Sequence, residues 1–155
     1  MVVARPMAQF VFNLAPVLRH RKNVEQERQR DVAVIQARLN ELESQLRALD
    51  ADVQRTNEHM RQNHLVGRIA PDLLAAHRRY LTATQRCALE IAQRMASVQR
   101  SLDEARLALA SAARDRKILE KLQDKQRFAW QSENDRREGN ALDEVAMQMA
   151  HRARK

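Results

Sequence analysis

The sequence contains few of the residues that let a chain turn or cross-link. Its 155 residues include 2 glycines, 3 prolines and 1 cysteine, Cys87. All-β and α/β folds need frequent tight turns, so this scarcity argues against both classes. A single cysteine cannot form a disulfide within the chain, which fits a reducing compartment. We interpret Cys87 as a small packing residue.

Long apolar runs are also missing from the sequence. No run approaches the roughly 20 residues that cross a bilayer. The opening residues lack the apolar core of a signal peptide. We therefore expect a cytoplasmic protein that associates peripherally with a larger assembly.

Motifs that carry out chemistry are absent as well. Two glycines cannot build a phosphate-binding loop, and no set of cysteines and histidines has the spacing of a zinc site. Acidic residues are abundant, but they fall on helix faces where no pocket would shift their pKa values. We expect no enzyme, no catalytic residue, no metal and no cofactor. The five histidines are interpreted as solvated helix residues: His20, His59, His64, His77 and His151.

About half of the residues are Ala, Glu, Lys, Leu or Arg, a composition typical of long helices. The net charge is +8, and the positive excess is spread along the chain. A nucleic-acid-binding protein more often concentrates its charge in one patch. Two interpretations of the excess charge remain: a solvated face, or attraction to an acidic protein surface.

A narrow apolar stripe organises the middle of the first half of the chain. Its members are spaced by alternating steps of three and four residues over about four heptads, with one polar interruption at Thr56. A stripe this narrow needs another helix along it. The members are Val32, Ile35, Leu39, Leu42, Leu46, Leu49, Val53 and Met60.

A second stripe provides the partner helix. Gly67 and Pro71 predict a turn between the two helices, because glycine permits a left-handed backbone and proline opens a helix. A short connection indicates an antiparallel hairpin, whose turn near Gly67 places the start of the first helix beside residues 119–121. The second stripe consists of Leu74, Leu81, Ala88, Ile91, Met95, Val98, Leu102, Ala105, Leu109, Ala112 and Leu119.

The predicted fold is all-α, a long antiparallel two-helix coiled-coil hairpin with a C-terminal helical overhang. Residues 1–12 form an extended lead-in, after which Asn13 caps the first helix and Pro16 lies in its first turn. The further boundaries are 13–62 for the first helix, 63–71 for the turn, 72–123 for the second helix and 124–155 for the overhang.

Two regions of this hairpin leave alternatives open. The stripe is polar from Arg21 to Arg28, where either long arginine stems cover a neighbouring helix or the chain meets a polar partner instead of its own second helix. The overhang bears Trp130, Leu142, Val145 and Met149, which either bind a partner or belong to a disordered tail.

Three stretches resemble one known family. Met7-Ala-Gln-Phe-Val-Phe-Asn-Leu-Ala-Pro-Val-Leu-Arg19 is similar to the opening of the flagellar export protein family FliJ, and suggests Met7 as an alternative start. Lys117-Ile-Leu-Glu-Lys-Leu-Gln-Asp124 and Leu142-Asp-Glu-Val-Ala146 resemble two later signatures of the same family. Together these stretches extend over nearly the whole chain.

The resemblance implies a role in flagellum biogenesis and motility, as a component of the bacterial type III protein export apparatus. It implies a central stalk in the export ATPase hexamer, at the inner membrane, with contacts to the cytoplasmic domain of the export gate and to export chaperones. The implied ATPase-binding residues are Leu14, Arg21, Glu25, Arg28, Lys117, Lys121 and Trp130. The implied gate-binding residues are Tyr80, Thr84, Cys87 and Ile91.

Three alternatives stand beside this interpretation. The first is the equivalent stalk of a virulence secretion system, and the second is a coiled-coil scaffold without an ATPase partner. The third is a basic nucleic-acid-associated protein, which would show a steep salt dependence of binding. We expect no direct membrane insertion and no nucleic acid partner.

Overall fold

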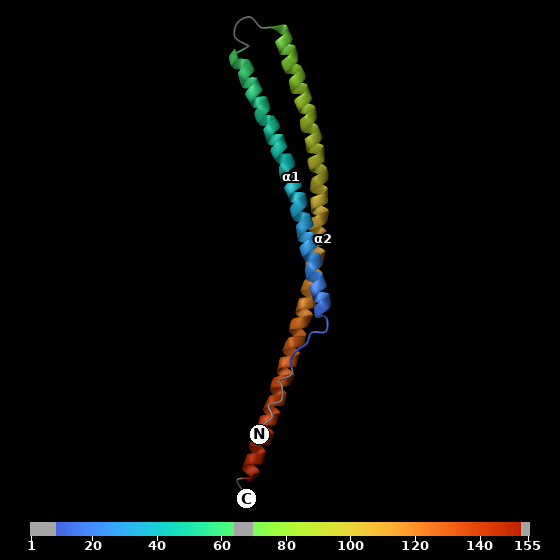
Figure 1. Cartoon of the computed structure of the whole chain (residues 1–155), viewed down its shortest axis with the longest axis vertical. Coiled ribbons are helices and arrows are strands. Elements are labelled where there is room, and N and C mark those ends of the chain that lie inside the picture. Colours follow the sequence, from blue (N-terminus) through green and yellow to red (C-terminus); the bar gives the residue numbers. More distant parts are fainter. Residues whose placement is uncertain (1–8, 64–69, 153–155) are drawn as a thin grey trace. The chain divides into compact units, whose positions relative to one another are not determined.

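Two helices make up the described part of the chain, residues 9–63 and 70–152, in a computed structural model (Figure 1). α1 extends over Ala15–Asn63 and α2 over Pro71–Arg152, and no strand occurs between residues 9 and 63 or between 70 and 152. The predicted all-α antiparallel hairpin with a C-terminal overhang is confirmed. The predictions for Gly67 and for residues 1–6 and Met7 lie outside the described residues.

Both helices begin at a proline-containing turn. In α1, the Leu18 N–H donates to the Leu14 carbonyl at 2.9 Å, so Pro16 lies in the first turn. In α2, the Leu74 N–H donates to the Ala70 carbonyl at 3.3 Å, which makes Pro71 the first helical residue. Proline is tolerated at both places because the first N–H groups of a helix have no partner within it.

The chain divides into two compact units, and α1 and α2 each contribute to both. Unit 1 comprises residues 1–25 with residues 111–155, and unit 2 comprises residues 26–110. Each unit therefore pairs one stretch of α1 with one stretch of α2. The two units are described separately below.

In unit 2, α1 and α2 pack against each other along the apolar stripes (Figure 1). Asn57 bonds to His77 across the pair at 3.1 Å, and Gln36 accepts from Arg106 at 3.2 Å, so the helices are antiparallel. All eight stripe residues of α1 are buried or half-buried. The most deeply buried residues of this unit are Leu39, Leu42, Met60, Ile91 and Leu102.

The start of α2 departs from the predicted stripe. Leu74 is 39% exposed, whereas His77 and Thr84 are half-buried beside α1. A line of residues seven apart drifts by about 20° per heptad around a straight helix, which has 3.6 residues per turn. Leu74 lies four heptads before Leu102, so this drift has carried it out of the helix interface. Polar residues such as His77 and Thr84 occupy the interface there instead.

Unit 1 is held together by a small apolar contact and by charges. Phe12 and Leu18 are each 6% exposed against α2. The Phe10 ring lies 6.1 Å from the Trp130 ring, and the Arg127 guanidinium lies 5.8 Å above Phe10. From residue 135 to residue 152 every α2 side chain is exposed.

Candidate functional site

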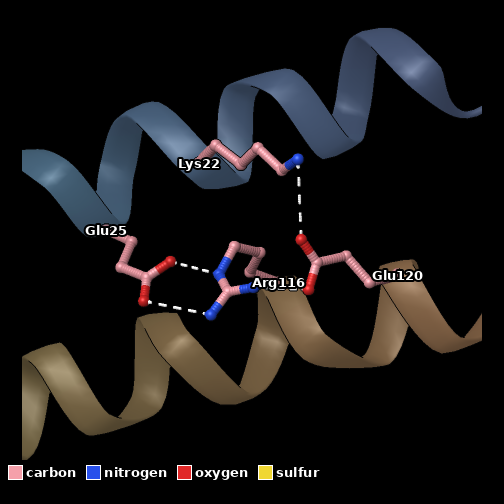
Figure 2. Close-up of polar contacts among 4 residues, drawn as sticks. All are labelled: Lys22, Glu25, Arg116 and Glu120. Atoms are coloured by element: carbon pink, nitrogen blue, oxygen red, sulfur yellow. Dashed lines mark hydrogen bonds and ion pairs between the residues drawn. The ribbon is translucent and has the colours of Figure 1, made fainter.

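The polar part of the α1 stripe in unit 1 forms a charged layer with α2. Arg21 Nη1 lies 3.1 Å from Asp115 Oδ2. The next residue, Lys22, has its Nζ 3.5 Å from Glu120 Oε1 (Figure 2). These pairs connect the two helices, so the polar stretch has its partner within the chain.

Arg116 is the centre of this layer (Figure 2). Its Nε donates to Glu25 Oε2, its Nη2 donates to Glu25 Oε1 at 3.4 Å, and its Nη1 donates to Glu120 Oε2. The Arg116 side chain is 22% exposed and the Glu25 side chain 13%. Such a two-bond arginine–carboxylate contact fixes both distance and orientation.

Hydrogen bonding keeps the layer charged. The bonds to Glu25, and then those to Glu120, raise the pKa of Arg116 above its ordinary value. The bond from Arg116 lowers the pKa of the Glu120 carboxyl. Both shifts favour the ionised forms, because each hydrogen bond is made to a charged group. The Arg116–Glu120 pair is therefore held in its charged form by hydrogen bonding.

Helical spacing explains why these charges meet. Glu25 lies seven residues before Val32, and Arg116 lies four residues after Ala112, so both occupy the interface positions of their helices. The hypothesis that this stretch meets a polar partner instead of its own second helix is wrong for Arg21 and Glu25, since both pair with α2. Charges at interface positions specify alignment rather than adding apolar stability.

The other predicted ATPase-binding residues are dispersed. Leu14 is 37% exposed, Lys117 and Lys121 are exposed, and Trp130 is half-buried beside Phe10. Arg28 belongs to unit 2, where it donates to Asp31 on its own helix at 3.2 Å. Arg21 and Glu25 therefore share the charged layer, and Arg28 does not.

The predicted gate-binding residues do not form one free surface. Ile91 is 5% exposed between the helices, and Tyr80 donates its hydroxyl proton to Asp52 of α1. The Thr84 hydroxyl donates to the Tyr80 carbonyl at 3.0 Å. Of these four residues, only Cys87 is exposed, so its interpretation as a small packing residue is wrong.

Sequence reasoning did not identify Asp115, Arg116 and Glu120 as site residues. Arg116 was visible in the sequence as a base on the α2 stripe where an apolar residue is expected, and Asp115 and Glu120 flank stripe positions. The sequence could have revealed the contact if the polar interruption of the α1 stripe had been compared with the polar interruption of the α2 stripe. Taken separately, each interruption resembles a solvated stretch.

The last turns of α2 carry exposed apolar side chains. Leu142 is 70% exposed, Val145 48% and Met149 68%. The spacing of these three residues places them on one face of the helix. This face has no counterpart among the described residues of unit 1.

Residues 9–63 and 70–152 hold neither a metal cluster nor a membrane-spanning helix. No group of three or more His, Cys, Asp or Glu side chains is arranged to hold a metal ion there. Neither α1 nor α2 is long and apolar enough to span a bilayer.

The model of a protein family described as flagellar FliJ protein matches residues 10–155. No curated protein and no solved structure matches the chain.

Proposed function

The chain belongs to the family of flagellar FliJ proteins, and on that premise we propose that it is the central stalk of an export ATPase ring. Membership indicates a role associated with flagellar type III protein export, in a family of non-enzymatic components. In this role the stalk promotes ring assembly and ATP turnover. It also contacts the export gate and export chaperones at the inner membrane.

The observation that supports the stalk is the charged layer of unit 1. Glu25, Arg116 and Glu120 fix the alignment of two helices whose apolar contact is small. A stalk must hold its two helices in a fixed relation while a surrounding ring contacts their outer faces. Two-bond ion pairs provide this fixed relation better than apolar contacts that tolerate sliding.

The outer faces of unit 1 supply the ATPase contact in this proposal. Lys117 and Lys121 are exposed one turn apart on α2, and neither forms an ion pair with a described carboxylate. Leu14 adds exposed apolar area at the start of α1. Arg21 and Glu25 contribute through the charged layer, and Trp130 through its contact with Phe10.

The gate contact is proposed for the exposed surface around Cys87. Tyr80 and Ile91 support this surface from behind by holding α2 against α1, and half-buried Thr84 bonds to the Tyr80 carbonyl of its own helix. The match to the flagellar family model also favours the flagellar role over the virulence alternative.

The stalk function is tested by mixing the purified chain with its cognate ATPase. We expect ring formation, seen by electron microscopy, and a rise in ATP turnover. The double variant Lys117→Glu/Lys121→Glu should lose most of this rise while keeping its helical circular dichroism. Unchanged rings and turnover across a wide range of ratios would refute the stalk.

Two controls separate contact from folding. Arg30→Glu/Arg38→Glu changes the net charge equally at exposed positions of unit 2 and should leave the stimulation intact. Arg21→Glu should weaken stimulation, and adding Asp115→Arg restores the ion pair with reversed polarity. If this swap restores stimulation, Arg21 acts only through helix alignment and does not touch the ATPase.

A further inference from the structure

An arginine-lined groove lies on the outer side of α2 in unit 2. It is formed by the first turns of the helix, drawn in green in Figure 1, and has a volume of about 750 Å³. Its charged members are Arg78, Arg79 and Arg86, with Asp72 at one end. Between them lie the small residues Ala75, Thr82 and Ala83.

The three arginines of this groove have no partner among the described residues. None forms an ion pair with a carboxylate of residues 9–63 or 70–152. By contrast, Arg94 lies 4.0 Å from Glu90 on the same helix, and Arg106 lies 3.9 Å from Asp103. The groove is therefore a site of uncompensated positive charge.

We propose that this groove binds an acidic α-helical segment of another protein, an inference that does not depend on the stalk function. Arg78 and Arg86 are eight residues apart, a rise of about 12 Å along α2. Carboxylates two turns apart on a partner helix have the same separation, so each can accept two hydrogen bonds from one guanidinium. Ala75 and Ala83 let the partner backbone come close, because they project little beyond the helix.

Asp72 gives the proposed partner a direction. Its carboxylate lies about 9 Å along the helix from Arg78, and its negative charge would repel another carboxylate. The partner therefore carries a basic residue at the end that meets Asp72. A run of carboxylates followed by a lysine or arginine fits this pattern of charge.

A lipid surface fits the groove less well. Helices that lie on membranes bury large apolar or aromatic side chains beside their basic residues. The apolar members of this groove are only alanines. A phosphate-bearing surface, whether lipid or nucleic acid, is therefore an alternative for the experiment to exclude.

The test uses the full chain and a labelled alanine-based helical peptide. The peptide bears glutamates on successive turns of one face and a lysine one turn beyond them. We expect saturable binding in fluorescence anisotropy at physiological salt. The variant Arg78→Glu/Arg86→Glu should weaken binding by about tenfold or more, because it removes the two outer charge-assisted contacts and adds repulsion.

Matched controls decide the result. Arg30→Glu/Arg38→Glu carries the same change of net charge on α1 of this unit and should leave affinity within about twofold. Replacing the peptide lysine by glutamine should weaken binding to the wild type but not to Asp72→Asn. Absence of binding, or equal losses in both double variants, would overturn the proposal.

Two further arms test the alternative partner. Vesicles of phosphatidylglycerol and phosphatidylcholine, and a duplex DNA of mixed sequence, replace the peptide under the same conditions. If either binds more tightly than the peptide and loses binding in Arg78→Glu/Arg86→Glu, the groove recognises phosphate and the proposal fails. Each double variant is checked for helicity, so that lost binding is not mistaken for unfolding.

Discussion

At the scale of residues, charge is used in two ways in this chain. Arg28 and Asp31 pair on the surface of α1, with side chains 51% and 53% exposed. Such a pair is worth little, because water screens it. Glu25 and Arg116 are 13% and 22% exposed, and each satisfies the other in a place where water reaches poorly. Removing Arg116 leaves Glu25 poorly hydrated without a counterion, which is the more damaging loss, whereas Arg116 without Glu25 still has Glu120.

The pH dependence of stability tests the charged layer. Arg116 lowers the pKa of Glu120 in the folded chain, so the unfolded chain binds a proton more readily. The stabilisation by Glu120 is therefore present above the ordinary carboxyl pKa of about 4.3. It is lost as the pH falls through the lowered value.

We expect Glu120→Gln to be less stable than the wild type at neutral pH, and the difference to shrink as the pH falls below about 4. Thermal unfolding followed by circular dichroism from pH 7 to pH 3 measures it. Glu138→Gln, at an exposed position far from the layer, serves as the control. A difference independent of pH would show that the carboxylate charge of Glu120 contributes nothing.

At the scale of elements, α2 changes character along its length. In unit 2 it buries Ile91 and Leu102 against α1, and in unit 1 it ends in exposed turns. Apolar residues spaced by seven face α1 along only part of α2, because a seven-residue repeat drifts around the helix axis. His77 and Tyr80 then make the contacts to α1 at the start of α2 through hydrogen bonds to Asn57 and Asp52.

Two leucines of α2 provide a matched pair for the packing in unit 2. Leu102 is 1% exposed and Leu107 is 72% exposed. Leu102→Ala should lower the free energy of unfolding by about 2–5 kcal/mol, since it removes buried methyl groups and leaves a cavity. Leu107→Ala should change it by less than about 0.5 kcal/mol. Urea denaturation measures both, and equal effects would contradict the helix pairing described for unit 2.

Gly139 lowers the local helix stability of the exposed part of α2. A β-carbon added there would meet no atom within 4 Å. Gly139→Ala should therefore stabilise the local helix by about 0.5–1 kcal/mol, because alanine loses less backbone entropy. Hydrogen exchange of the flanking amides should slow by about threefold. The reverse change Ala141→Gly should speed it, and no change in either variant would mean that these turns open by another route.

At the scale of the whole molecule, the sequence was sufficient for the fold but not for the side-chain contacts. The stripes from Val32 to Met60 and from Leu81 to Leu119 indicated two antiparallel helices, since narrow apolar stripes have few other solutions. A turn centred near Gly67 would pair Glu25 with Leu109, whereas Glu25 bonds to Arg116. Helical side chains lean about one turn toward the N-terminus, in opposite directions in an antiparallel pair, so long side chains meet outside the backbone alignment.

The candidate sites were less predictable than the fold. Gate-binding residues were chosen by resemblance, which carries no information about which way a side chain points. Tyr80 and Ile91 consequently proved to face α1. The unpaired state of Arg78, Arg79 and Arg86 was equally hidden, because it depends on where every nearby carboxylate lies.

The trio of Glu25, Arg116 and Glu120 also constrains how the gene can change. A reversal of charge at any one of the three creates repulsion with a half-buried neighbour, so a lone substitution is selected against. For Glu25 the compensating change lies on the other helix, at Arg116, and a changed Arg116 must also suit Glu120 on its own helix. Two neighbouring codons, for Arg116 and Glu120, are therefore tied to the distant codon for Glu25.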